Sequence, residues 1–116
     1  MAAQFNGNAL LAEYGDESLV AELAQLFLES ASSQMDAILG AVERNDAEAL
    51  RAAAHRLRGA VATFGADSAA QWSYALESMA TDGDLRGARD LASRLQVDMR
   101  SLCDGASAWV AGHIAA

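Results

Sequence analysis

The chain has 116 residues, 53% of them hydrophobic and 21% charged, which suits one domain with a core and excludes a disordered tail. Its formal net charge is −8, from sixteen acidic residues and eight arginines with no lysine, which argues against binding to nucleic acid or to an anionic membrane surface. No apolar run approaches the roughly 18 residues that cross a membrane, no signal peptide begins the chain, and one cysteine fits a reducing compartment, so we expect a cytoplasmic protein.

Proline is absent and apolar residues recur at helical spacing, which predicts an all-α fold. The first predicted helix is short, because Asn6 is a suitable N-cap and Gly15 provides a left-handed end. A second helix begins after Asp16, another N-cap, and runs to about residue 44, which makes it about 40 Å long. Serines interrupt its middle, but we do not expect them to split it.

The third predicted helix begins at a capping-box pattern, with Asn45 as the N-cap and Glu48 three residues later. It runs to about Phe64, where Gly65 can take the left-handed conformation that ends a helix. The fourth helix runs from residue 66 or 67 to about residue 79. Its expected inward-facing residues are Ala69, Trp72, Leu76 and Met79.

A turn over residues 81–84 separates the fourth helix from a fifth, whose expected core residues are Leu85, Ala88, Leu91, Ala92, Leu95, Met99 and Leu102. Asp104 and Gly105 weaken the pattern, so residues 106–116 are either a frayed extension of this helix or a tail. Four amphipathic helices joined by short turns predict an antiparallel up-down-up-down four-helix bundle over about residues 16–104, with the short first helix at one end. We expect residues 1–116 to form a single domain and a monomer.

One histidine, His55, stands apart from the apolar pattern of the third helix. At about 100° per residue the apolar side chains of that helix fall in one arc, and His55 lies roughly 150° from its middle, so we expect the imidazole to face solvent. Its neighbours on the helix surface are Arg51 at i−4, Arg58 at i+3 and Gly59 at i+4. This basic patch on an acidic protein indicates a site for an anionic partner.

An exposed imidazole can act as a metal ligand, a general base or a covalent nucleophile. Neither Cys103 nor His113 stands at a metal-ligand spacing from it, and no serine or cysteine lies in a hydrolase motif. Glycine loops that bind nucleotides are also missing from the sequence. What remains is covalent phosphoryl carriage, in which Arg58 neutralises the phosphate, Gly59 leaves room for a partner protein, and that partner supplies the metal.

The chain resembles the histidine-containing phosphotransfer (HPt) domain family in the segment at residues 54–66, Ala-His-Arg-Leu-Arg-Gly-Ala-Val-Ala-Thr-Phe-Gly-Ala. The family pattern is alanine and histidine, one variable residue, then leucine, a basic residue and glycine, with a second glycine at the helix end. Leu76 and Glu77 match the leucine–glutamate pair of the next helix. The resemblance runs from Leu10 to about Leu102 and so covers nearly the whole chain.

The resemblance implies that His55 accepts a phosphoryl group on Nε2 and exchanges it with the aspartate of a response-regulator receiver domain. Arg58 stands where the family usually has lysine, and Gly59 matches the family glycine. Glu77 takes the place of a polar residue that hydrogen-bonds the other ring nitrogen. The implied protein is a phosphocarrier rather than an enzyme. It needs no cofactor, since magnesium is expected on the receiver, and a hybrid sensor kinase is a further expected partner.

Two other functions are also consistent with the sequence. A bundle that is never phosphorylated could bind and sequester a receiver or another regulator. The Thr63-Phe64-Gly65 stretch also resembles the amino-terminal phosphotransfer module of a chemotaxis-type kinase, although the length favours a stand-alone carrier. Arg51 and Arg56 fit either a partner contact or a solvated helix face, and Leu28 points off the core stripe, as expected for a receiver-docking residue.

Overall fold

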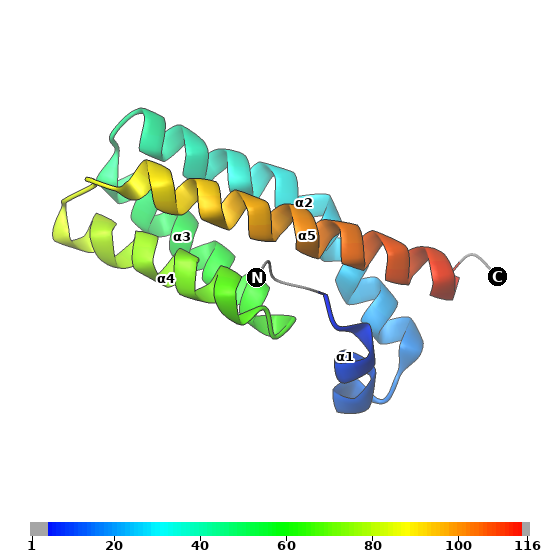
Figure 1. Ribbon diagram of the computed structural model, residues 1–116. Helices are drawn as coiled ribbons and strands as arrows, with labels where there is room; N and C mark the ends of the chain where they lie inside the picture. Colours follow the sequence, from blue (N-terminus) through cyan, green and yellow to red (C-terminus); the bar gives the residue numbers. More distant parts are fainter. Residues whose placement is uncertain (1–4, 115–116) are drawn as a thin grey trace.

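The computed structural model describes residues 5–114 and contains five helices and no strand among these residues (Figure 1). The helices are α1 (Gly7–Tyr14), α2 (Glu17–Glu43), α3 (Ala47–Thr63), α4 (Asp67–Asp82) and α5 (Ala88–Ile114). The all-α prediction is confirmed. The serines in the middle of α2 leave it as one continuous helix, as expected.

Helices α2 to α5 run alternately in opposite directions and form a four-helix bundle (Figure 1). Around the bundle, α2 packs on α3, α3 on α4, α4 on α5, and α5 on α2. The short α1 packs on α2, at the end of the bundle where α2 begins. The two helices that carry the sequence motif, α3 and α4, are therefore direct neighbours.

The core consists of the apolar stripes that the four long helices turn toward the bundle axis. In α4 the buried residues are Ala69, Ser73, Leu76 and Ala80. Trp72 and Met79, expected to face inward, are only half-buried and pack at the edge of the core. Ser73 is tolerated inside because its hydroxyl donates a hydrogen bond to the carbonyl of Ala69 at 2.8 Å.

The first two N-cap predictions are confirmed, and the third is wrong. The Asn6 side chain accepts from the backbone of Ala9, and Asp16 accepts from Ser18 and Leu19. The capping box at Asn45 does not form, because Asp46 caps α3 by accepting from the backbone N–H of Ala49 at 3.1 Å. Asn45 instead takes the left-handed conformation that ends α2, with φ 53°, which asparagine tolerates better than most residues.

The turn between α4 and α5 lies later in the chain than expected. Helix α4 continues past Met79 to Asp82 and ends at Gly83, which has φ 74°. Leu85 lies outside α5, which begins at Ala88, so its predicted place in the fifth helix is wrong. The cause is local, since the carboxylate of Asp84 accepts hydrogen bonds from both the backbone N–H and the guanidinium of Arg86. These bonds form a turn at residues 84–86, and the helix begins after it. These hydrogen bonds lower the pKa of Asp84 to about 2.

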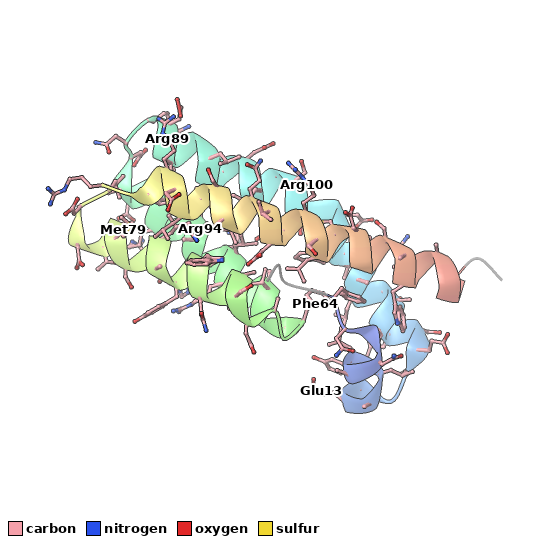
Figure 2. The ribbon with its side chains drawn as sticks, viewed as in Figure 1. Glu13, Phe64, Met79, Arg89, Arg94 and Arg100 are labelled. Carbon is pink, nitrogen blue, oxygen red and sulfur yellow. The ribbon has the colours of Figure 1, made fainter. Side chains whose placement is uncertain are left out.

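Residues 106–114 are an extension of α5 rather than a tail. Gly105 does not break the helix; it lets the backbone of Phe5 approach, because a Cβ at position 105 would lie 2.8 Å from the Cβ of Phe5. The ring of Phe5 then packs against Phe64 at 5.7 Å and against Trp109 at 6.3 Å between centroids. Phe64, labelled in Figure 2, belongs to this aromatic cluster at the α1 end of the bundle. The side chain of His113 lies outside the described part of the chain.

Candidate functional site

His55 lies in the middle of α3 and faces solvent, as its place in the helical pattern predicts. Its side chain is 61% exposed, whereas Ala54 and Leu57 beside it are fully buried in the core. Because the helix backbone on both sides is packed against the bundle, the position of the imidazole is held by a rigid element. The ring is therefore accessible to a partner on a stiff support.

Glu77 reaches the imidazole from α4. Its Oε2 atom lies 2.8 Å from Nδ1 of His55, and the glutamate side chain is only 17% exposed. A carboxylate accepts hydrogen bonds, so Nδ1 carries the proton and donates the hydrogen bond to Glu77. In the neutral form of the ring the lone pair is then on Nε2, the nitrogen not engaged by the carboxylate. The contact fixes both the orientation and the tautomer of the imidazole.

Arg58 also turns toward α4. Its Nη1 atom lies 3.4 Å from Oε1 of Glu77, an ion-pair distance, and its Cζ lies 5.2 Å from the centroid of the Tyr74 ring. Among the described residues no group donates a hydrogen bond to Oε1, so the contact with Arg58 is electrostatic. A cation thus lies beside the carboxylate that orients His55.

The other two arginines of α3 differ in their partners. Arg51 binds Glu48 in the same helix, with 2.6 Å between Nη2 and Oε1 and 3.3 Å between Nε and Oε2. These hydrogen bonds lower the pKa of Glu48 and raise the pKa of Arg51. Arg56 is exposed, and no carboxylate in the described part of the chain forms an ion pair with it. Arg56 is therefore the unpaired arginine next to His55 among the residues that the structure describes.

Gly59 follows His55 by one helical turn on the same exposed face. A Cβ added at this glycine would meet no atom of the described chain within 4 Å. Glycine inside a helix costs about 1 kcal/mol relative to alanine, and neither packing nor a positive φ explains it here. The folded chain itself does not require a glycine at this position.

On its α2 side, the exposed face of α3 borders an apolar hollow. The hollow is lined by Leu23, Leu26, Phe27, Ser30, Ala60, Thr63 and Phe64. Leu26 is 62% exposed, although it is one of the apolar residues that recur along α2. In helical projection it lies roughly 130° from the middle of the buried arc of α2, which is the signal that identifies it as a surface residue.

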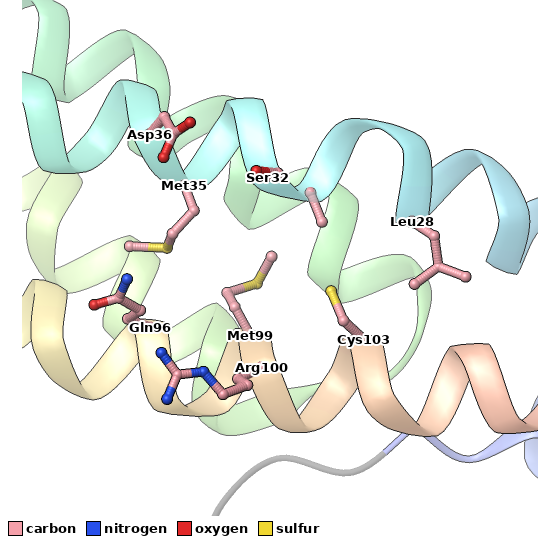
Figure 3. Close-up of a pocket in the computed structure, with 9 residues that line it drawn as sticks. Leu28, Ser32, Met35, Asp36, Gln96, Met99, Arg100 and Cys103 are labelled. Atoms are coloured by element: carbon pink, nitrogen blue, oxygen red, sulfur yellow. The ribbon is translucent and has the colours of Figure 1, made fainter.

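Leu28 lies elsewhere. It is half-buried and lines a cleft of about 340 Å³ between α2 and α5, together with Met35, Met99 and Cys103 (Figure 3). This cleft is on the side of the bundle away from the pair of helices that carries His55 and Glu77, so Leu28 is not beside the imidazole. Burial raises the pKa of the Cys103 thiol, with a smaller contribution from the charge of Asp104, as expected for a structural thiol.

Within residues 5–114, no group of three or more histidine, cysteine, aspartate or glutamate side chains is arranged to hold a metal ion. The same residues include no helix that is long and apolar enough to span a membrane. The site consists of an oriented imidazole, a carboxylate, cations and an open helix face. Such a set can hold and transfer a charged group, and it fits covalent carriage on a nitrogen.

Comparison with known proteins agrees with this geometry. The model of the Hpt domain matches residues 22–109, which is most of the chain. The chain therefore belongs to the Hpt domain family, whose members carry phosphoryl groups on histidine in phosphorelays and interact with response-regulator receiver domains. No curated protein and no solved structure matches the chain.

Proposed function

We propose that His55 is the phospho-accepting residue of a histidine phosphotransfer protein. The observation that carries this proposal is the hydrogen bond from its Nδ1 to Glu77 at 2.8 Å on an otherwise exposed ring, which leaves the Nε2 lone pair free for attack. The group is exchanged with the aspartate of a response-regulator receiver domain, and a hybrid sensor kinase supplies it. The protein acts as a monomeric carrier in the cytoplasm and has no ATP site of its own.

The transfer step uses each nitrogen of His55 differently. The Nε2 lone pair attacks phosphorus in the aspartyl phosphate, the new P–N bond forms, and the P–O bond to aspartate breaks with its electron pair going to the aspartate carboxylate. The proton stays on Nδ1, so the phosphorylated ring is cationic, and the Glu77 carboxylate offsets that charge. Reversal returns the phosphoryl group to an aspartate.

Arg58 stabilises the charge that spreads over the phosphoryl oxygens during transfer. Its guanidinium already lies on the α4 side of the site, against Glu77. A planar fork with several donors can contact two phosphoryl oxygens at once, which a lysine ammonium in the same place does less specifically. The magnesium ion that such transfer requires belongs to the receiver, so the carrier needs no cofactor.

The surface around His55 fits the approach of another protein. Gly59 leaves the space beside the ring open, and no packing contact of the fold offsets the lower helix stability of glycine. The hollow with Leu23 and Leu26 supplies an exposed apolar contact on the α2 side. Arg56 adds a free positive charge toward the acidic, metal-loaded site of a receiver. Together they support a docking face centred on α3.

The test is phosphotransfer from a labelled, phosphorylated receiver. We expect acid-labile label on the wild-type protein and none on His55→Gln, while His113→Gln, the change of the other histidine, keeps it. Binding of the receiver without label on wild type would support the adaptor function, in which the bundle sequesters its partner. Label on His55→Gln would overturn the assignment of the residue.

A further inference from the structure

Tyr74 lies on α4 one helical turn before Glu77 and is 56% exposed, so the core does not fix its ring. The group that meets the ring is the guanidinium of Arg58. Tyr74 also lines two hollows on the α4 side of the site, one with Arg58 and Gly59 and the other with Glu77. It is therefore a neighbour of the charged groups of the site rather than a packing residue.

Arg58 has two contacts on α4, and each alone is weak. Its ion pair with Glu77, at 3.4 Å, lacks a hydrogen bond to Oε1 within the described structure. Partly exposed ion pairs hold a long side chain poorly, and arginine has many rotamers to choose from. The face of an aromatic ring attracts a guanidinium within about 6 Å of its centroid, and 5.2 Å satisfies this. The ring and the carboxylate together restrict where the cation can go.

We propose that Tyr74 is a positioning residue whose ring holds Arg58 beside Glu77 and His55, so that the cation is in place when a phosphoryl group reaches Nε2. The inference rests on the proposed function of His55, although the stacking itself can be tested without phosphotransfer. The ring face carries the interaction, so phenylalanine can replace tyrosine and leucine cannot. An exposed cation–π contact changes the population of the stacked arginine about two- to fivefold, and we expect the same factor in the phosphorylation rate.

The experiment compares Tyr74→Phe, Tyr74→Leu and the matched control Tyr14→Leu, which changes an exposed tyrosine at the end of α1. The isolated proteins are phosphorylated with phosphoramidate, a small phosphoryl donor, so that docking of a receiver plays no part. We expect Tyr74→Leu to react about two- to fivefold more slowly than wild type. Tyr74→Phe and the control should match wild type. In an Arg58→Gln background, Tyr74→Leu should cause no further loss.

A second measurement follows the stacking alone. The Nε–Hε proton of Arg58 should show a ring-current shift in wild type and Tyr74→Phe, and should lose it in Tyr74→Leu. Equal phosphorylation rates in wild type and Tyr74→Leu would overturn the inference while leaving the proposed function intact. An undiminished effect of Tyr74→Leu in the Arg58→Gln background would also overturn it. Wild-type protein that phosphoramidate and phosphorylated receivers both fail to label would instead overturn the proposed function.

Discussion

The carboxylate of Glu77 on α4 holds the imidazole of His55 on α3, with 2.8 Å between Oε2 and Nδ1. The two residues are 22 positions apart in sequence, and their contact depends on the close packing of α3 against α4. In the neutral ring this relationship places the proton on Nδ1 and leaves the lone pair on Nε2. The role of each side chain can be separated by substitution.

Glu77→Ala should slow phosphorylation of His55 by about tenfold to a hundredfold, since a charge-assisted hydrogen bond contributes about 1.5–3 kcal/mol. Glu77→Gln keeps an acceptor oxygen for Nδ1 but removes the negative charge, so its rate should fall between wild type and Glu77→Ala. The 15N chemical shifts of the ring should show loss of the Nδ1–H tautomer in Glu77→Ala. Wild-type rates in both variants would mean that the carboxylate does not assist the transfer.

Substitutions of Gly59 should affect folding stability and phosphotransfer from a receiver in different ways. Gly59→Ala should raise the free energy of unfolding by about 0.5–1 kcal/mol, because the added Cβ meets open space and alanine favours the helix. Gly59→Leu should also fold, yet it should slow transfer from a receiver at least about tenfold by obstructing the approach to Nε2. Thermal unfolding and transfer kinetics measure the two effects.

Ala108→Leu is the matched control for Gly59→Leu, since it adds a leucine at an exposed position of α5. It should leave receiver transfer unchanged. Phosphoramidate should still label Gly59→Leu, because a small donor needs less room than a protein. If Gly59→Leu accepted phosphate from a receiver at the wild-type rate, the docking face would not include this part of α3.

Arg56 and Arg100 form a pair for testing charge at the docking face. Both are exposed and lack an ion pair with any described carboxylate, but Arg56 is next to His55 and Arg100 lies on α5 (Figure 2). Arg56→Gln should lower the second-order rate of receiver transfer about threefold at low salt, and the difference should vanish at high salt. Arg100→Gln should have no effect. Equal salt dependence in the two variants would exclude a steering role for Arg56.

The exposure of His55 could be predicted from the sequence, but its contact with Glu77 could be proposed only by resemblance. Sequence pattern places Trp72 and Met79 on the buried face of α4 with Ala69 and Leu76, whereas the structure centres that face on Ser73, Leu76 and Ala80. This is a rotation of roughly 50° about the helix axis. It arises because the small residues Ser73 and Ala80 let α4 pack closely against the bundle. The indole of Trp72 stays at the edge of the core, where the guanidinium of Arg94 lies 5.6 Å from its ring centroid. The rotation turns Glu77 toward α3.

Sequence pattern is also limited at the other end of the chain, because Gly105, which weakens the helical pattern, is a packing contact in the structure. Gly105→Ala should lower the free energy of unfolding by about 1–3 kcal/mol, since its Cβ would lie 2.8 Å from that of Phe5. Gly112→Ala, in the same helix but with open space around its Cβ, should instead raise stability by about 0.5 kcal/mol. In a Phe5→Gly background the cost of Gly105→Ala should shrink, because glycine lacks the Cβ that the new methyl group would meet. Thermal unfolding of the four variants measures this, and a Gly105→Ala protein as stable as Gly112→Ala would mean that the Phe5 segment does not pack on α5 in solution.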